Sequence, residues 1–242
     1  MSTITIEPRA AELLGEASDW RLIGLLFERP RGGWWRDTAA LSAASNDPVL
    51  KEAGELTGAV DERRYLGLLG PGGPISPRES GYRRTADPSR SLSEIRAFFH
   101  AFAFEPERED PVDHIAVMCA FLGWMRLKEA YAVASGDVEA IELTRAAADR
   151  FAREHLAPCA ETLAARLEEF EAGHLVLAAR ALVARVGPRP KDAEGDWVPQ
   201  GLGVDDPSMT CGLGETSGEE PVGEVGLPPE FTAGLKVDRL EA

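Results

Sequence analysis

Apolar residues recur at spacings of three and four along the chain as far as about residue 187, and no segment alternates convincingly with period two. Ala10, Leu13 and Ala17 show this spacing in a first long segment, which we expect to end near Pro30. A period of 3.6 residues places such side chains on one face of an α-helix, whereas a half-buried strand needs period two. The pattern therefore predicts an all-α fold, a single globular helical bundle.

Residues that cap helices divide this pattern into separate helices. Asp47 precedes a proline and Asp137 follows a glycine, so both acids suit the N-cap of a new helix. Residues 91–94 read Ser-Leu-Ser-Glu, a capping box that predicts a helix start. Pro158 and Gly173 are expected to separate the last helices, because proline breaks a helix interior and glycine often ends a helix.

The composition changes at Pro188. Residues 188–242 include 4 basic and 12 acidic residues, many glycines and prolines, and almost no periodicity. Such a segment cannot bury enough apolar surface to offset the conformational entropy it would lose on ordering. We therefore expect a helical domain of residues 1–187 and an acidic, largely irregular tail of residues 188–242. Local docking of the tail would use its large apolar side chains Trp197, Met209 or Phe231.

Charge and cysteine usage narrow the class of protein. The net charge of −15 argues against nucleic acid as a partner, since phosphate binding needs clustered lysine and arginine. An acidic surface instead attracts a basic peptide or domain. The three cysteines form no C-x-x-C, which fits reduced thiols. No signal-peptide pattern is visible, and the longest charge-free apolar run, residues 115–125, is about half of the roughly 20 residues that a membrane helix needs. We expect a cytoplasmic protein without membrane insertion.

Residues 110–125 place an acid and an imidazole at the start of an apolar helix. Asp110 suits the N-cap, Pro111 the first helical position and Asp113 the third. Asp113 and His114 could be a general acid–base pair, or they could only make a good helix start. Neighbours on a helix point about 100° apart, which favours the second interpretation. We expect Asp113→Asn to change stability by less than about 1 kcal/mol, because asparagine caps nearly as well.

Residues 70–84 are the second unusual segment. They include three prolines and four glycines and are therefore not expected to be helical. A loop of this length in a compact helical domain is usually functional or disordered. Ile75 and Tyr82 would anchor it. It has no Walker lysine and follows no strand, so it is not a phosphate-binding loop.

The remaining residues give little support for catalysis. The histidines, Cys119 and Cys159 form no i,i+4 pair of strong metal ligands, and the single E-x-x-H at residues 171–174 is interrupted by Gly173. Neither a nucleophile elbow nor a dinucleotide fingerprint is present. We predict no catalytic residue, no metal and no cofactor. Two alternatives stay open: a small helical metallohydrolase using His114 and Asp113, and a general adaptor acting through the acidic tail.

Three motifs in a fixed order carry a family resemblance. They are Gly-Pro-x-x-Pro-Ile-Ser-Pro-x-Glu-Ser-x-Tyr at 70–82, Pro-x-Asp-His-Ile-Ala at 111–116 and His-Leu-x-Pro at 155–158. Together they resemble the TorD/DmsD/NarJ family of redox-enzyme maturation chaperones over about residues 20–186. The loop and tail are most similar to chaperones of type II DMSO-reductase-family molybdoenzymes, such as ethylbenzene, dimethylsulfide, selenate or chlorate dehydrogenases and reductases. Cys159 stands where many members have tryptophan, and Gly81 where valine is common.

The resemblance implies an all-helical cytoplasmic protein that is not an enzyme and is a monomer or a homodimer. It implies binding of the molybdenum-containing catalytic subunit of a redox enzyme, often through its twin-arginine signal peptide, until the cofactor is inserted. The implied signal-peptide pocket is formed by two motifs that we expect to meet in space, with the residues Glu79, Ser80, Tyr82, Pro111, Asp113 and His114.

The chemistry of such a leader peptide suits these residue types. A twin-arginine leader is basic at one end and apolar after it, so it needs an acid at one end of an apolar groove. We expect Asp113 and Glu79 to supply the acid, and Phe121 and Trp124 to supply the apolar wall.

Overall fold

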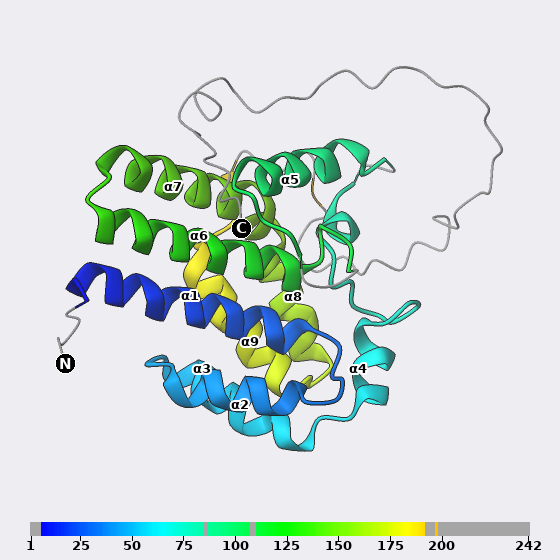
Figure 1. The fold of residues 1–242 in the computed structure, drawn as a ribbon. Coiled ribbons are helices and arrows are strands. Elements are labelled where there is room, and N and C mark those ends of the chain that lie inside the picture. The colour runs from blue at the N-terminus through cyan, green and yellow to red at the C-terminus, as the bar shows by residue number, and fades with distance from the viewer. Residues whose placement is uncertain (1–5, 85–86, 107–109, 192–196, 198–242) are drawn as a thin grey trace.

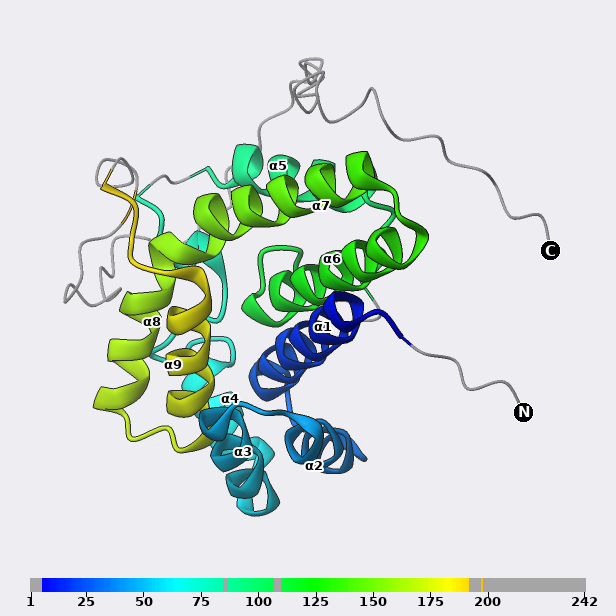
Figure 2. The same cartoon turned by 90° about the vertical axis from the view of Figure 1, so that its left-hand side faces the viewer.

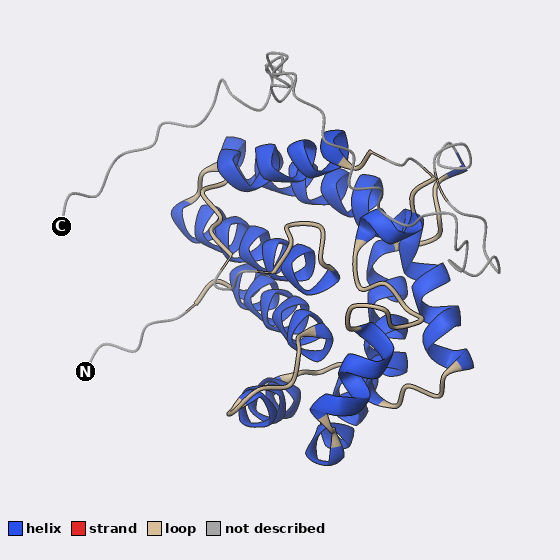
Figure 3. Cartoon of the chain, turned by 90° about the vertical axis from the view of Figure 1, so that its right-hand side faces the viewer, coloured by secondary structure: helices blue, strands red, loops and turns tan. Residues whose placement is uncertain are grey.

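The computed structural model describes residues 6–84, 87–106, 110–191 and 197 (Figure 1). Within these ranges the chain forms α-helices joined by loops and short 3-10 or π-helical turns, with no β-strand (Figure 3). The predicted all-α fold class is confirmed. None of the described helices is long and apolar enough to cross a membrane.

The helices follow the caps and breaks of the sequence closely in most places. In chain order they are α1 (Pro8–Phe27), α2 (Trp34–Ala44), α3 (Pro48–Glu55), α4 (Glu62–Leu69), α5 (Ser89–Ala101), α6 (Ile115–Ser135), α7 (Val138–Phe151), α8 (Ala157–Glu169) and α9 (His174–Val186). The shorter turns are η1 (Leu56–Ala59), η2 (Glu79–Tyr82) and the π-helical η3 (Ala152–Leu156).

Two of the predicted caps are present with their hydrogen bonds. The Asp47 carboxylate accepts from the amide of Val49 at 2.8 Å, at the start of α3. The Asp137 carboxylate accepts from the amide of Ala140 at 3.0 Å, at the start of α7. Gly136 ends α6 with φ of +71°, a left-handed conformation that glycine adopts without steric cost.

Three local predictions are wrong. The helix α5 begins at Ser89, so Ser91 lies inside it and turns its hydroxyl toward Glu79 instead of capping. Pro158 stands at the second position of α8, where proline is tolerated, and η3 joins α7 to α8 without the expected break. The loop of residues 70–84 is not wholly irregular, since it contains η2.

The helices α1 and α6 form an antiparallel pair at the centre of the molecule (Figures 1 and 2). Two glycines allow their backbones to approach closely. A Cβ on Gly24 of α1 would lie 2.9 Å from the carbonyl oxygen of Ala116, and a Cβ on Gly123 of α6 would lie 3.1 Å from that of Ala17. A larger residue at Gly24 would force the two helices apart.

Aromatic rings fill the space between α5, α6 and α7. Phe121 packs against Phe151 with 4.7 Å between ring centroids, and Phe98 packs against Phe151 at 5.3 Å. Such tilted and edge-to-face contacts stabilise a core beyond the area they bury. The phenylalanines of α5 therefore belong to the core.

The chain beyond α9 returns to the body at one described residue. Trp197 is 4% exposed, and the guanidinium of Arg83 lies 4.2 Å from the centroid of its ring. Local docking through Trp197 is therefore present, while Met209 and Phe231 lie outside the described residues. The division into a domain of residues 1–187 and a tail of residues 188–242 stays a prediction.

The close approach of α1 and α6 gives a testable prediction. Gly24→Ala should destabilise the protein by about 1–3 kcal/mol, because its methyl group would meet backbone that cannot move aside cheaply. Gly15→Ala on the same helix is the matched control. No atom lies within 4 Å of the added Cβ there, so stability should rise by roughly 0.5–1 kcal/mol. Urea unfolding of both variants measures the difference, and equal stability would contradict the packing argument.

A second prediction concerns acid stability. His174 starts α9 beside the ring of Trp34, and burial lowers its pKa from 6.5 to about 4. Below pH 6.5 the unfolded chain therefore binds a proton that the folded chain does not, so stability falls as the pH drops from 6.5 to about 4. This group should cost about 2 kcal/mol between pH 7 and pH 5.

The measurement is urea unfolding at pH 7 and pH 5 for the natural chain and for His174→Gln. The variant should lose less stability on acidification, whatever its stability at pH 7. An unchanged pH dependence would show that His174 is not held neutral by the fold.

Candidate functional site

The loop of residues 70–84 and the start of α6 are joined by hydrogen bonds. The Asp113 carboxylate accepts from Arg78 Nε at 2.9 Å and from the Ser80 amide at 3.2 Å. The backbone adds two bonds, from the Glu79 amide to the Asp113 carbonyl at 2.9 Å and from the Ile115 amide to the Pro77 carbonyl at 2.8 Å. The two motifs therefore meet in space, as expected from the sequence.

The start of α6 differs from the prediction. The helix begins at Ile115, and His114 is its N-cap, with Nδ1 accepting from the amide of Ala116 at 3.1 Å. Burial lowers the pKa of His114, which keeps the ring neutral and able to accept this bond. Asp110, Pro111 and Asp113 are thus not the N-cap, first and third helical residues. The amide of His114 bonds to the carbonyl of Pro111 at 2.9 Å, and this turn directs Asp113 toward the loop.

Glu79 is a second buried carboxylate in the same region. It accepts from Arg83 Nε at 2.7 Å and from the hydroxyl of Ser91 at 2.9 Å. The Nδ1 atom of His155 lies 3.0 Å from its other oxygen. Glu79 therefore links the loop to α5 through Ser91 and to η3 through His155.

Burial separates the six predicted site residues into two groups. Glu79 and Asp113 are 0% exposed, and Tyr82 is 2% exposed with its hydroxyl donating to the Ser76 carbonyl at 2.7 Å. Together with His114, these buried side chains stabilise the fold. Ser80 is half-buried and Pro111 is exposed. Binding of a partner by these six residues stays a prediction.

The geometry offers little for catalysis or metal binding in the part of the chain that the structure describes. His114 Nδ1 is occupied by the α6 backbone, and the Asp113 carboxylate is occupied by the loop. No group of three His, Cys, Asp or Glu side chains that could hold a metal is found among the described residues. Burial raises the pKa of the Cys119 and Cys159 thiols, so neither is a ready nucleophile.

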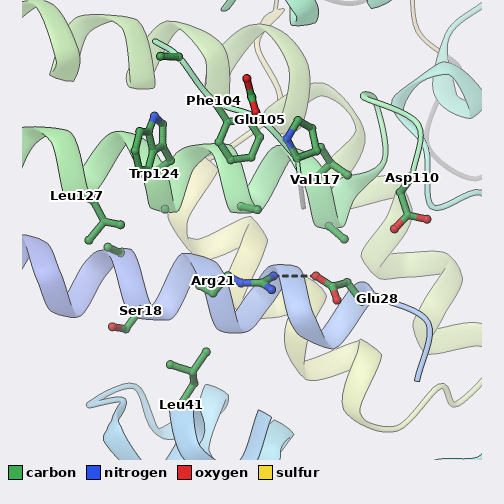
Figure 4. Close-up of a pocket in the computed structure, with 16 residues that line it drawn as sticks. Ser18, Arg21, Glu28, Leu41, Phe104, Glu105, Asp110, Val117, Trp124 and Leu127 are labelled. Atoms are coloured by element: carbon green, nitrogen blue, oxygen red, sulfur yellow. Dashed lines mark hydrogen bonds and ion pairs between the residues drawn. The ribbon is translucent and has the colours of Figure 1, made fainter. Parts of the chain in front are cut away.

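An open groove of about 550 Å³ runs along the face of α1 and α6 beside this region (Figure 4). Its lining is mostly apolar and comes from α1, α2, α6 and the chain between α5 and α6. The lining residues are Ala17, Ser18, Arg21, Glu28, Leu41, Ala103, Phe104, Glu105, Pro106, Asp110, Ala116, Val117, Ala120, Gly123, Trp124 and Leu127.

Small residues line the groove where α1 and α6 meet, and larger ones stand along its sides. Leu41 lies on the α2 side, with Phe104 and Trp124 on the other side (Figure 4). The indole of Trp124 is fixed by a hydrogen bond to the carbonyl of Phe102 at 2.9 Å. Of the two residues predicted to form the apolar wall, Trp124 lines this groove, whereas Phe121 does not and is 0% exposed in the core.

One end of the groove carries Asp110 and the Arg21–Glu28 ion pair. Asp110 lies there, close to the start of α6, and the buried Glu28 carboxylate accepts from Arg21 at 2.7 Å (Figure 4). Glu105 adds an exposed carboxylate above the middle of the groove. The groove therefore offers apolar surface along its length and, since Glu28 is paired with Arg21, the negative charge of Asp110 at one end.

The contribution of α1 was missed from the sequence. The missed signal is a stripe of small residues at helical spacing in an otherwise bulky helix, at Ala116, Ala120 and Gly123 of α6. Such a stripe allows another backbone to come close. Ala116 and Val117 directly follow the helix start that Asp113 and His114 hold, so the buried motifs position one end of the groove.

Comparison with known protein families finds a match. The model of a family described as nitrate reductase delta subunit matches residues 39–165, slightly more than half of the chain of 242 residues. The matched region includes the loop of residues 70–84 and the start of α6. No curated protein and no solved structure matches the chain.

The burial of Asp113 changes the expectation for its substitution. Asp113→Asn should now cost roughly 1.5–3 kcal/mol, since it removes the charge from a buried carboxylate that pairs with Arg78 instead of changing an exposed helix cap. Asp137→Asn is the matched control, because Asp137 is an exposed N-cap, and it should change stability by less than about 0.5 kcal/mol. Thermal or urea unfolding measures the stability of both variants. An equal loss of stability in the two would show that Asp113 acts only as a helix cap.

Proposed function

The chain belongs to the nitrate reductase delta subunit family, and we propose that it binds the leader peptide of one molybdenum-containing catalytic subunit in the groove between α1 and α6. Members of this family are non-catalytic chaperones for the maturation of molybdoenzymes. The chaperone would hold its client until the cofactor is inserted and export can begin.

The observation that supports this proposal most directly is the polarity of the groove. A twin-arginine leader has a basic segment followed by an apolar one. The groove has the carboxylate of Asp110 at one end, beside the Arg21–Glu28 ion pair, and an apolar lining that continues to Leu127. Arginine beside a carboxylate forms a strong charge-assisted hydrogen bond, and an apolar segment gains by leaving water. The net charge of −15 would also favour encounter with a basic peptide.

The two sequence motifs take a supporting part in this proposal. Pro111 is exposed next to Asp110, at the acidic end of the groove, and is the motif residue best placed to touch a bound leader. Asp113 and Glu79 would act indirectly, by holding the first turn of α6 in position. We thus propose that the six residues implied by the family resemblance form two groups: buried residues that hold the fold, and residues that a bound partner can reach.

The proposal also covers the location, the oligomeric state and the client of the protein. We place the chaperone in the cytoplasm, as a monomer or homodimer, with no cofactor of its own. Its client would be a DMSO-reductase-family enzyme. The type II enzymes are favoured because the loop and tail resemble those of their chaperones. The adaptor alternative would require the acidic tail for binding, whereas the groove lies wholly within the described body.

The groove can be tested by adding a charge to its apolar surface. Ala120→Glu should weaken binding of a client leader peptide by about tenfold or more, since a carboxylate would have to be desolvated against the apolar segment. Ala146→Glu, on the exposed surface of α7, is the matched control and should bind normally. Fluorescence anisotropy with a labelled leader gives the dissociation constants.

A second position guards against a folding defect. If Ala120→Glu does not fold, Leu41→Glu on the α2 side of the groove introduces the same charge at a half-buried position. Full affinity in a folded groove variant would rule out this groove as the leader site. Loss of binding on deleting residues 198–242 alone would favour the adaptor.

A further inference from the structure

Trp197 covers a buried ion pair that belongs to the loop of residues 70–84. The Arg83 guanidinium donates from Nε to the Glu79 carboxylate at 2.7 Å, and it lies 4.2 Å from the centroid of the Trp197 ring. Glu79 is 0% exposed and the Arg83 side chain is 15% exposed, so the pair is almost closed to water. Trp197 is itself buried, and its ring takes the place of water over the arginine.

The backbones of Arg83 and Trp197 are paired as well. Arg83 follows η2 in an extended conformation, with φ of −90° and ψ of 145°, and forms an antiparallel bridge with Trp197. Pairing of an extended segment with another backbone, with a side chain seated beside it, is a common mode of peptide recognition. The backbone bridge and the ring contact are both made with Arg83, so this loop residue fastens Trp197 to the body.

The ion pair under Trp197 is connected to the start of α6. The amide of Glu79 donates to the Asp113 carbonyl at 2.9 Å, and the Ile115 amide donates to the Pro77 carbonyl at 2.8 Å. A charge pair is stronger where water is excluded, because the surrounding dielectric is lower. Exclusion of water from the pair should therefore hold the loop, and with it the first turn of α6, in place.

Trp197 can leave this position without unfolding the helices. Residues 187–196 separate it from the end of α9, so its departure from Arg83 does not require α9 to open. Segments held by few contacts open locally at a lower free-energy cost than the whole fold. The covered and the uncovered ion pair are therefore two states that the protein can exchange while its helices stay folded.

We propose that Trp197 is a lid on the Arg83–Glu79 pair, and that its position on Arg83 controls how firmly the loop holds the first turn of α6. The chain after α9 thereby regulates the client groove from outside it, since Ala116 and Val117 of the groove belong to this turn. The regulation of the groove rests on the proposed function, whereas the lid does not.

Removal of the ring from the full chain tests the lid, with hydrogen exchange of backbone amides as the measurement. In Trp197→Ala the amides of Glu79 and Ile115 should exchange at least about tenfold faster, and amides in the middle of α9 should change less, because only the loop opens. Trp197→Phe keeps an aromatic ring over Arg83 and should restore most of the protection. If Trp197→Ala does not fold, Trp197→Leu keeps apolar bulk without the ring and should show the same pattern to a smaller extent.

Trp35→Ala is the matched control for the loss of a tryptophan. Trp35 also stacks with an arginine, since the Arg36 guanidinium lies 5.1 Å from its ring centroid, but it is 53% exposed at the start of α2. This variant should leave the exchange of the Glu79 and Ile115 amides unchanged. Equal acceleration at all amides of a Trp197 variant, or none at these two, would overturn the lid.

Binding of a synthetic leader peptide, two arginines followed by an apolar segment, tests the regulation. Trp197→Ala should bind it about three- to tenfold more weakly than the natural chain, because a loosened first turn of α6 has to be ordered on binding, and Trp197→Phe should bind nearly normally. Faster exchange with unchanged affinity would show that the lid does not control the groove. If the natural chain binds no leader, the proposed function fails, while the exchange experiment still decides on the lid.

Discussion

Two carboxylates without solvent exposure, Asp113 and Glu79, hold together the segments on which the rest of the structure depends. Burying a carboxylate is costly unless hydrogen bonds and an opposite charge replace its water. Here each acid has an arginine from the loop, Arg78 for Asp113 and Arg83 for Glu79. Because each pair would leave an unbalanced charge if one partner moved, the loop, α5, η3 and the start of α6 are held in one arrangement.

The position of α6 in turn determines the groove. Its first turn, held by the His114 cap and the bond from Ile115 to Pro77, supplies Ala116 and Val117 to the lining. Gly24 and Gly123 then allow α1 to lie against α6 closely enough for Ala17 to join the same surface. Small residues thus have two effects: they permit the close contact between α1 and α6, and they leave an open groove above it.

A chaperone of this family has to bind its client and later release it. An open apolar groove with charge at one end suits this task, because apolar contact supplies affinity while exposed acids contribute mainly to encounter and orientation. The buried polar network adjoins one end of the groove, where it holds the first turn of α6 and so fixes Ala116 and Val117 of the lining. Trp197 stacks on Arg83, which connects the region after α9 to the same network.

The sequence by itself determined the all-α fold, most helix ends and the importance of the two motifs. Helical period and caps such as Asp47 and Asp137 act over four residues or fewer, so they can be read locally. The motif residues also identified the loop and the helix start that meet. Their family resemblance, confirmed by the match over residues 39–165, indicated the class of function.

Only the tertiary structure decided that Asp113 and Glu79 are buried, that α6 begins at Ile115 and that the accessible surface is a groove shared with α1. Each of these depends on contacts between segments far apart in the chain, such as Glu79 with His155 or Gly24 with Ala116. The residues next to a given residue in the sequence do not indicate which distant residues it will contact. The same carboxylate is a helix cap or a buried anchor according to what packs against it, and that is determined by the fold as a whole.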